Sequence, residues 1–323
     1  MSTYTNKSNI PLSVATWLAH DTYDHDERPN HLSVTSLMKP LKQLILAARV
    51  DKKMYKPDVA SMIPSRIGTA IHDMLENSWT SGYRNNLFNL GVPSKIIDKV
   101  RINPEVEEEG TIPVYLEKRA EKEIDGFIIS GKFDFIGEGR VEDLKTTSVY
   151  TFMNKTNDEK YILQGSLYRW LNPDKITRDD MAIQFIFTDW SGARIREPGY
   201  PNARHHEHRL DLMPIVAAES YVRRKLALIK KYWDAPESEI PDCTNEDLWR
   251  KADAWKYYKN PAKTVRSTKN YDNQMEADMR ASLEGGIVVK KPGQVVACRF
   301  CAAFPECTQK DRYLNSGELN LGG

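Results

Sequence analysis

No charge of one sign dominates this chain of 323 residues, because 46 Lys and Arg residues balance 45 Asp and Glu residues. At a net charge of +1, attraction to an acidic partner must come from local patches rather than from a global field. The sequence also has no signal peptide and no apolar run long enough to span a membrane. We therefore expect a cytoplasmic protein with no membrane partner.

Cysteine is scarce, and sequence repeats are lacking. The chain has four cysteines, and none of them precedes Cys243. No internal repeat or low-complexity tract interrupts the sequence, and 40% of the residues are hydrophobic. A chain of this length and composition can bury a substantial core, so we expect one elaborated domain or a domain with an appendage.

Two neighbouring acidic segments predict a β-hairpin with charged side chains in common. Asp134 follows a stretch of strand-forming apolar residues, 127–133, and Asp143 and Lys145 lie in the next such stretch. The Gly-Glu-Gly-Arg sequence at 137–140 between them is typical of a turn. Alternate side chains of a strand share a face, so Asp143 and Lys145 project together, and strand pairing brings Asp134 close to them.

Two carboxylates and one ammonium group suit a hydrolytic Mg²⁺ site for phosphodiesters. The carboxylates hold a hard cation that polarises the phosphate and lowers the pKa of a bound water, while the ammonium group orients that water or meets developing negative charge. The alternative is a solvated strand face with an ordinary ion pair. Residues 51–53 and 158–160 have the same acidic-x-Lys spacing without a preceding Gly-x-x-Asp strand, so the spacing alone is not specific.

A predicted helix over residues 65–79 supplies a nitrogen ligand. Ser65 is the expected N-cap after a proline, and His72 and Glu76 share a helix face because they are four residues apart. Gly68, one turn earlier, lets the helix approach another backbone closely. His72 can join a metal site made mainly of carboxylates; the alternative is a helical histidine that is hydrogen-bonded to Glu76.

A second predicted helix, over residues 159–171, carries a polar and aromatic stripe. Tyr161, Gln164 and Tyr168 are spaced by three and four residues and therefore share one face. An amide and a phenol there could orient the lysine or contact a DNA backbone. The alternative is the edge of a core whose polar tips are hydrogen-bonded.

Taken in order, these motifs resemble the PD-(D/E)XK nuclease superfamily, and specifically its RecB-like exonuclease branch. The motifs are Gly68-x-x-x-His72, Gly131-x-x-Asp134, Asp143-x-Lys145 and Gln164-x-x-x-Tyr168, which place the resemblance over roughly residues 33–170. The resemblance implies an α/β fold with a restriction-endonuclease-like core, in which a mixed β-sheet is flanked by helices. It also implies a protein of the bacterial cytoplasm or of a phage-infected host.

The resemblance also implies roles for individual residues. His72, Asp134 and Asp143 would bind Mg²⁺ or Mn²⁺, with the backbone carbonyl of Leu144 as a further ligand, and Lys145 would be the catalytic lysine. The supporting or DNA-contacting residues would be Glu76, Glu117, Gln164 and Tyr168. Glu117 matches an acidic position that often precedes the hairpin in this branch.

The four cysteines predict a second metal centre. Cys243, Cys298, Cys301 and Cys307 are more typical of metal binding than of disulfides in a cytosolic protein, and four thiolates suit a 4Fe-4S cluster or tetrahedral zinc. Zinc ribbons usually have two Cys-x-x-Cys pairs, and this chain has one. The Cys-x2-Cys-x5-Cys ending resembles the iron–sulfur nucleases of the AddB-type and CRISPR-adaptation groups. In those proteins the fourth cysteine usually precedes the core, and Cys243 looks like its replacement; unligated thiols are the remaining alternative.

The same reading divides the chain and places further elements. We expect a polar arm at 1–32, a nuclease core with helical elaborations at 33–240, and a region tied by the four-cysteine site at 241–323. Apolar periodicity predicts a helix over 36–49 interrupted early by Pro40, a strand over 182–188, and a helix over 215–233 with one basic face.

Two further stretches have competing interpretations. Residues 249–266 interleave aromatic and basic residues, which suits either a path for a single nucleic-acid strand or an amphipathic helix with solvated lysines. The segment Arg204-His-His-Glu-His208 is rich in histidine, but adjacent histidines on a loop rarely converge on one ion, so we do not expect a zinc site there.

The sequence therefore predicts a metal-dependent DNA exonuclease, which the resemblance places in phage or bacterial recombination, repair or genome processing. The same site could serve a structure- or site-specific endonuclease. A hypothesis of another class is a non-catalytic DNA-binding or assembly module, against which the intact Lys145 argues. The DNA would be single-stranded or a duplex end, and a recombinase or a single-strand-binding protein could be a partner. Helicase motifs are lacking, so any unwinding must come from elsewhere; the oligomeric state is left open.

Overall fold

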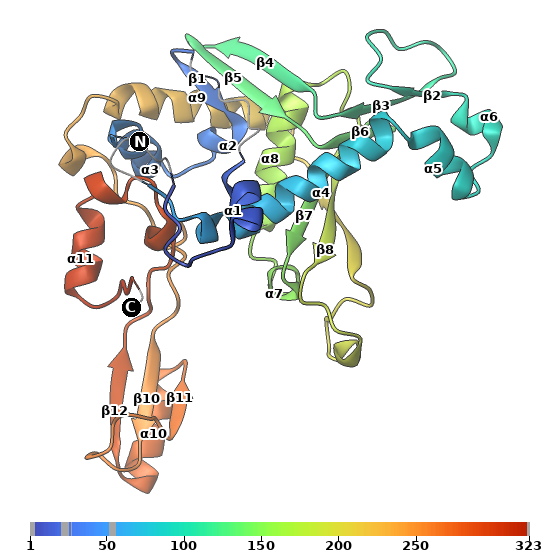
Figure 1. Cartoon of the computed structure of the whole chain (residues 1–323). Helices are drawn as coiled ribbons and strands as arrows, with labels where there is room; N and C mark the ends of the chain where they lie inside the picture. Colours follow the sequence, from blue (N-terminus) through green and yellow to red (C-terminus); the bar gives the residue numbers. More distant parts are fainter. Residues whose placement is uncertain (1–3, 21–25, 27, 52–55, 322–323) are drawn as a thin grey trace. The chain divides into compact units, whose positions relative to one another are not determined.

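The computed structural model describes residues 4–20, 26, 28–51 and 56–321. The chain divides into two compact units, Met1–Met38 with Tyr55–Leu226, and Lys39–Met54 with Ala227–Gly323 (Figure 1). Both units are discontinuous in sequence, because an early segment that begins at Lys39 groups with the C-terminal residues, and periodicity cannot reveal such long-range pairing.

A six-stranded mixed sheet is the largest feature of the first unit. Its strands, in spatial order, are β2 (Val100–Ile102), β3 (Ile112–Leu116), β6 (Phe135–Gly137), β7 (Arg140–Thr147), β8 (Asp180–Phe187) and β9 (His205–Asp211). The pairs β2–β3 and β7–β8 are parallel, and the other neighbours are antiparallel. Ile183, Phe185 and Phe187 of β8 are fully buried, as expected of a strand in the middle of a core. The predicted mixed sheet with flanking helices is confirmed.

A second sheet of the same unit explains where the predicted hairpin bends. Its strands lie in the order β1 (His31–Ser33), β5 (Phe127–Lys132) and β4 (Arg119–Ile124). The chain leaves β5, turns at residues 133–134 and enters the other sheet as β6, which pairs with β7 in the register Phe135↔Glu142. The predicted hairpin is therefore present, but the strand before its turn is split between two sheets. Asp134 lies at the corner between them.

Helices of the first unit pack against these sheets. They are α1 (Leu12–Ala19), α2 (Val34–Leu37), the short 3-10 helix η1 (Val59–Met62), α4 (Ile63–Thr80), α5 (Tyr83–Asn89), α6 (Ser94–Ile97), α7 (Val149–Met153), α8 (Asp158–Leu171), the 3-10 turn η2 (Gly192–Arg194) and α9 (Ile215–Tyr232), whose residues to Leu226 belong to this unit. Helix α4 lies against β7, and α8 lies against β5, β7 and β8 (Figure 1). None of the described helices is long and apolar enough to cross a membrane.

Several boundaries differ from the sequence predictions. Helix α4 begins at Ile63, because a proline is accommodated in the first helical turn, so Ser65 is not its N-cap. Residues 205–211 form the edge strand β9 and not a loop. The ring nitrogens of His205 and His208 are hydrogen-bonded to Gln184 and Asp158 respectively. The predicted arm at 1–32 contains α1, whose Leu18 is fully buried.

The second unit has a helical part and a small β-sheet. The helical part comprises α3 (Leu41–Arg49), α11 (Gln309–Asn315) and the 3-10 turns η3 (Glu237–Glu239), η4 (Ala297–Phe300) and η5 (Phe304–Glu306). Helix α3 begins after Pro40, as predicted. The small sheet has the antiparallel order β11 (Lys269–Tyr271), β10 (Ala254–Tyr258), β12 (Ile287–Lys291), with helix α10 (Gln274–Glu284) packed on it. We call these residues, 254–291, the β10–β12 module.

The alternative of an amphipathic helix over 249–266 is wrong. Trp255 and Tyr257 are two residues apart and pack together with Ala277 and Ala281 of α10. That spacing is the period of a strand, which places alternate side chains on one face. Some aromatic residues of this stretch are therefore packed in the local core.

A buried lysine ties α3 to the C-terminal residues of the second unit. Lys42 is only 4% exposed, and its Nζ lies 2.6 Å from Glu237 Oε1 and 2.8 Å from Asp242 Oδ1. Asp242 also pairs with Arg312 of α11, and Glu237 accepts a hydrogen bond from the backbone of Thr308. Burying an ammonium group without partners is costly, so these carboxylates fix α3 against the region that carries the cysteines.

Replacing Lys42 tests this role. We expect Lys42→Ala to lower the free energy of unfolding by about 2–3 kcal/mol, less than for a fully buried pair because Asp242 is partly hydrated. The fold lowers the pKa of Asp242 and of Glu237, in each case because the partners Lys42, Arg312 or Thr308 outweigh burial. The stabilisation is therefore complete above about pH 4.3 and is lost as the pH falls through the lowered pKa values.

Urea titrations at pH 7 and pH 3 measure the difference in the free energy of unfolding between wild type and Lys42→Ala. The matched control is Glu284→Gln, which breaks an exposed i,i+4 pair with Arg280 and should change stability by less than about 0.5 kcal/mol. An unchanged difference at the two pH values would show that Lys42 acts through its apolar stem and not through the ion pairs.

Candidate active site

The corner at Asp134 brings the acidic residues of the hairpin together. Asp134 Oδ2 accepts a hydrogen bond from the backbone N–H of Leu144 at 2.8 Å, which fixes the carboxylate beside β7. On β7, Asp143 and Lys145 project from the same face and form an ion pair. The Asp143 carboxylate is 2% exposed, whereas the Lys145 side chain is 30% exposed. The Lys145 side chain is therefore partly accessible to solvent, whereas its carboxylate partner is buried.

Burial and charge shift the pKa values of this pair in a consistent way. Burial, with the negative charge of Asp134 in addition, raises the pKa of Asp143 to about 6 against the opposing effect of Lys145. Burial alone would lower the pKa of Lys145, but Asp143 and Asp134 outweigh it and raise that pKa. Lys145 therefore remains a cation, as an electrostatic catalyst or a water-orienting donor must.

His72 of α4 sits among oxygen atoms from three other segments. Its Nε2 lies 3.1 Å from the carbonyl oxygen of Leu144, and its Nδ1 lies 3.4 Å from Asp134 Oδ2 and 3.9 Å from Glu117 Oε1. Asp134 and Glu117 together raise the pKa of His72 to about 10. The alternative of a hydrogen bond to Glu76 is not what the described contacts show, because both ring nitrogens face this oxygen cluster.

Glu117 reaches the cluster with an unusual backbone. It follows β3 with a φ of 49°, in the left-handed region that non-glycine residues rarely adopt. Its carboxylate forms an ion pair with Lys132 at the end of β5, and its side chain is 13% exposed. Strain of this kind persists only where the surrounding structure enforces it, and it is found preferentially at functional sites.

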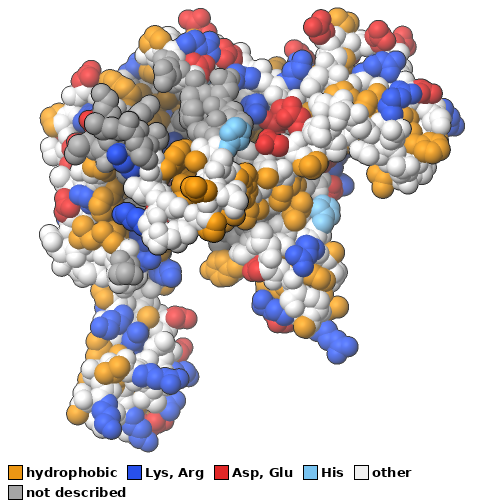
Figure 2. All heavy atoms as spheres, in the orientation of Figure 1, with side chains coloured by type: hydrophobic (Ala, Val, Ile, Leu, Met, Phe, Trp, Pro, Cys, Tyr) orange, Lys and Arg blue, Asp and Glu red, His pale blue; other side chains and the backbone are white. Residues whose placement is uncertain are grey.

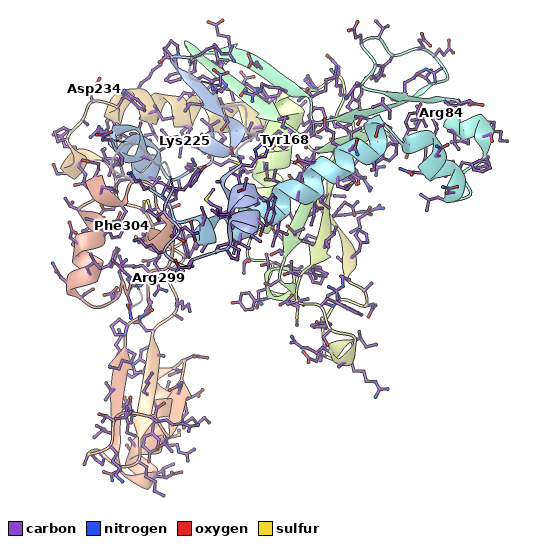
Figure 3. All side chains as sticks on the ribbon, in the orientation of Figure 1. Arg84, Tyr168, Lys225, Asp234, Arg299 and Phe304 are labelled. Carbon is purple, nitrogen blue, oxygen red and sulfur yellow. The ribbon has the colours of Figure 1, made fainter. Side chains whose placement is uncertain are left out.

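Helix α8 covers the site from the side of β5. Gln164 Nε2 donates to the Tyr168 hydroxyl at 3.0 Å, a contact between two residues of the predicted polar and aromatic stripe. Burial, together with the negative charges of Asp143 and Asp134, raises the pKa of Tyr168. Burial also raises the pKa of Tyr161, although the positive charge of Lys145 opposes that shift. Tyr168 of α8 is labelled in Figure 3. A Cβ atom added to Gly131 would lie 3.0 Å from the Tyr168 ring. Gly131 therefore allows β5 and α8 to pack closely.

The cluster opens into a cavity of about 670 Å³ in the first unit. Its lining includes His72, Glu117, Asp134 and three basic residues that sequence reasoning missed: Arg66, Arg119 and Lys132. Arg66 belongs to the helix that carries His72, and Lys132 directly precedes Phe133 and Asp134. A search for basic residues that flank the motifs could therefore have identified them. Because Asp73, Glu117 and Asp134 line the same cavity, an anionic ligand would meet these cations beside carboxylates that can hold a divalent ion.

The remaining predicted residues take less central places. Glu76 lies on α4, and its charge acts on Lys132 at the end of β5; among the described residues no hydrogen bond joins it to His72. Gly68 faces β7, but a Cβ there would be 3.7 Å from Thr146 Oγ1, an ordinary contact. The close approach that was expected at Gly68 therefore does not require glycine.

The donor set fits a hard divalent cation. One ligand atom each from His72, Glu117 and Asp134 lies within 4.8 Å of the others. Ligands bonded to one ion at about 2.1–2.2 Å lie about 3–4.4 Å apart, so small side-chain movements would complete such a site. Oxygen donors with one imidazole suit Mg²⁺ or Mn²⁺. Asp143 lies outside this group, because its carboxylate is directed to Lys145.

The four cysteines meet in the second unit. Cys298 is buried in a small core with Leu248 and Val295, against which Cys243 packs. Burial, Asp247 and the other three thiols raise the pKa of Cys243 to about 12, and burial with Cys301 and Cys307 raises that of Cys298 to about 11. No three of these sulfurs, among the residues described, lie within 4.8 Å of one another, whereas a tetrahedral zinc site needs spacings of about 3.8 Å.

Comparisons with known proteins give distant structural likenesses only. The protein SSO0001 aligns with a TM-score of 0.39 and 12% identity over 63% of this chain and 79% of its own. A phage-related exonuclease from Haemophilus somnus 129PT aligns with a TM-score of 0.26 and 17% identity over 38% of this chain and 61% of its own. No protein-family model and no curated protein sequence matches the chain.

Two substitutions of Glu117 separate the effect of its left-handed backbone on stability from the effect of its charge. Glu117→Gly and Glu117→Ala both remove the carboxylate, but only glycine adopts this conformation without a steric cost. We therefore expect the glycine variant to be more stable by about 1 kcal/mol, the reverse of the usual order away from such positions. Urea denaturation of both variants measures this difference. Equal stability, or a more stable alanine variant, would contradict the conformation described.

Proposed function

We propose that this protein is a metal-dependent DNA exonuclease of the RecB-like PD-(D/E)XK type, with its nuclease core in residues 33–240. The observation that carries the proposal is the convergence of Asp134, His72 and the Asp143–Lys145 pair from three segments, with Asp134 and His72 lining the cavity. A structural ion pair needs neither a second carboxylate nor an imidazole. DNA is the proposed substrate because the motif resemblance points to phosphodiester cleavage, and because Arg66, Arg119 and Lys132 are among the residues that line the cavity.

Mg²⁺ or Mn²⁺ would be held by His72, Asp134 and Glu117, with the Leu144 carbonyl and Asp143 adjacent. Bound there, such an ion supplies Lewis acidity toward the phosphate and lowers the pKa of the attacking water. Glu117 replaces Asp143 in this proposed inner set, because the Asp143 carboxylate is engaged with Lys145. Glu76 would act at longer range, through Lys132.

The chain's own residues have distinct tasks in this scheme. Lys145 remains protonated, so its ammonium group can donate hydrogen bonds to the water or to the phosphate oxygen on which charge develops. Asp143 holds Lys145 in position by the ion pair. Gln164 and Tyr168 form the polar wall beside Gly131, where they restrict the approach of the substrate. Arg66, Arg119 and Lys132 would receive neighbouring phosphates.

We further propose that Cys243, Cys298, Cys301 and Cys307 bind a 4Fe-4S cluster that ties residues 241–323 together. The support is the placement of the four cysteines in the second unit, where Cys298 is buried in a small core, Cys243 packs against that core, and Cys301 and Cys307 act on the pKa of Cys243. Four cysteines near one another suit a 4Fe-4S cluster, whose thiolates bind separate iron atoms. Zinc is the competing occupant. A cytoplasmic role in phage or bacterial recombination or repair, with a recombinase or single-strand-binding partner, belongs to the same proposal.

Cleavage of end-labelled DNA tests the nuclease proposal. Protein purified without oxygen should degrade linear DNA with Mg²⁺ or Mn²⁺, and removal of the ion with EDTA should stop the reaction. Lys145→Ala should lower the rate by on the order of 10²- to 10³-fold. Lys160→Ala is the matched control, because residues 158–160 have the same spacing on an exposed helix turn.

Closed circular substrates separate the alternatives. An exonuclease leaves circles intact, whereas cutting of circles would replace this proposal with an endonuclease. DNA binding without cleavage under every ion condition would favour a non-catalytic module.

Elemental analysis tests the cysteine proposal independently of cleavage. Wild type should contain about four iron and four sulfide per chain with a broad visible absorption. Cys298→Ser should lose the iron and unfold at a lower denaturant concentration, because the bound group stabilises the second unit. Lys145→Ala should keep the full iron content. One zinc per chain with no sulfide would contradict the cluster.

A further inference from the structure

We propose that Trp249 and Phe300 form a stacking platform for the bases of single-stranded DNA, with Lys251 and Arg299 holding the adjoining phosphates. Both rings belong to the second unit, and their centroids are 6.5 Å apart with an interplanar angle of 38°. Trp249 is 51% exposed and Phe300 is 75% exposed. Every base has a π face, so such a platform binds unpaired bases with little dependence on sequence.

The backbone holds the indole of Trp249 away from the core. Leu248 is buried, and its carbonyl accepts hydrogen bonds from the N–H groups of Val296 and Ala297. At the next residue the chain adopts a φ of 49°, and Arg250 N–H closes the turn onto the carbonyl of Asn245 at 2.9 Å. A left-handed conformation is a genuine outlier for a bulky residue. Among the described non-glycine residues with positive φ, Trp249 is the only aromatic one.

Phe300 is turned outward from a segment whose other residues serve the core. It ends η4, between the buried Cys298 and the partly buried Cys301. Leu248, Val295, Cys298 and Leu319 already form the apolar core beneath. The two exposed rings are therefore surplus to that core, and they lie next to each other although they are fifty residues apart in sequence.

Cations flank the two rings. Lys251 and Arg299 are both exposed, and Gln294 links them: its carbonyl accepts from the Lys251 N–H at 3.0 Å, and its Oε1 accepts from Arg299 Nη2 at 3.2 Å. Figure 3 labels Arg299 close to where the chain enters the β10–β12 module. The acidic residues of the same turn are Glu246 and Asp247; the Asp247 carboxylate accepts a hydrogen bond from the Thr244 N–H within the turn itself.

The β10–β12 module extends this positive surface. Its exposed or half-buried cations include Lys256, Lys259, Lys263, Arg266, Lys269 and Lys291, whereas Arg280 and Lys290 pair with Glu284 and Asp253. Figure 2 shows Lys and Arg side chains spread over the module. An apolar protein segment would gain nothing from these charges, whereas a polyanionic strand gains a phosphate contact from each. Aromatic faces beside a basic track therefore favour single-stranded DNA over a protein as the occupant.

The inference rests on the proposed function for the choice of DNA, but its test needs no cleavage. Anisotropy of a short labelled oligothymidine is measured with the Lys145→Ala protein, loaded at its cysteine site and without added Mg²⁺ or Mn²⁺. Trp249→Gly and Phe300→Ser should each weaken binding on the order of 10-fold. Glycine is favoured at the left-handed position, so Trp249→Gly should remain folded. Trp249→Phe should retain most of the affinity.

An abasic strand of the same length distinguishes stacking from charge. The two ring variants should bind it as the Lys145→Ala parent does, whereas Lys251→Ala and Arg299→Ala should weaken binding to both strands and each lower the salt slope by about 0.7. Phe88→Ser, which removes an exposed phenylalanine of α5, is the matched control and should have no effect.

Three results would overturn the platform: unchanged affinity in the ring variants, equal losses on the abasic strand, or loss of self-association with DNA affinity intact, which would make the rings a contact between copies of the chain. Cleavage by wild type is recorded separately. Ring-dependent binding without any nuclease activity would reject the proposed function and keep the platform. Cleavage by wild type, with DNA binding that does not depend on the two rings, would keep the proposed function and reject the platform.

Discussion

The burial of the Asp143 carboxylate beside Lys145 is the constraint on which the rest of the site depends. A carboxylate that is 2% exposed is costly unless it is paired. Asp134 places a second negative charge nearby, which raises the pKa of Asp143 still further. The fold must then supply positive charge at the same place, and without a bound metal ion it does so with Lys145 and the imidazolium of His72, which would release a proton on binding a metal. A purely structural core would be more stable with apolar residues at these positions, so the arrangement is better explained by chemistry than by stability.

The two sheets of the first unit determine where that charge is placed. The chain passes from β5 to β6 at Asp134, so one residue is anchored by both sheets and its carboxylate is fixed by the Leu144 N–H. Helix α4 adds His72 from one side, and the end of β3 adds Glu117 in a strained conformation. Sites held by rigid elements of this kind keep their geometry when a substrate binds.

The sequence predicted those parts of the site that depend on local periodicity. The alternation around Asp143 and Lys145, with a Gly-rich turn before them, was sufficient to predict the hairpin, and the four-residue spacing of Gln164 and Tyr168 was sufficient to place them on one helix face. The split at residues 133–134 could not be predicted, because the apolar alternation continues through it while the hydrogen-bond partners change. The same limit applies to the stretch at 254–258, whose aromatic residues fit either a helix face or a strand face until α10 is placed. The roles of the individual residues remain proposals.

The most direct test of the central claim is the affinity of the protein for Mn²⁺, measured by titration with the free ion in the absence of DNA. If the oxygen cluster around His72 is a metal site, Asp134→Asn should weaken binding by at least about 10-fold, while Lys145→Ala should bind Mn²⁺ at least as tightly as wild type because a nearby positive charge is removed. Equal affinity in wild type and Asp134→Asn would contradict the account, since the corner carboxylate would then have no part in holding a cation.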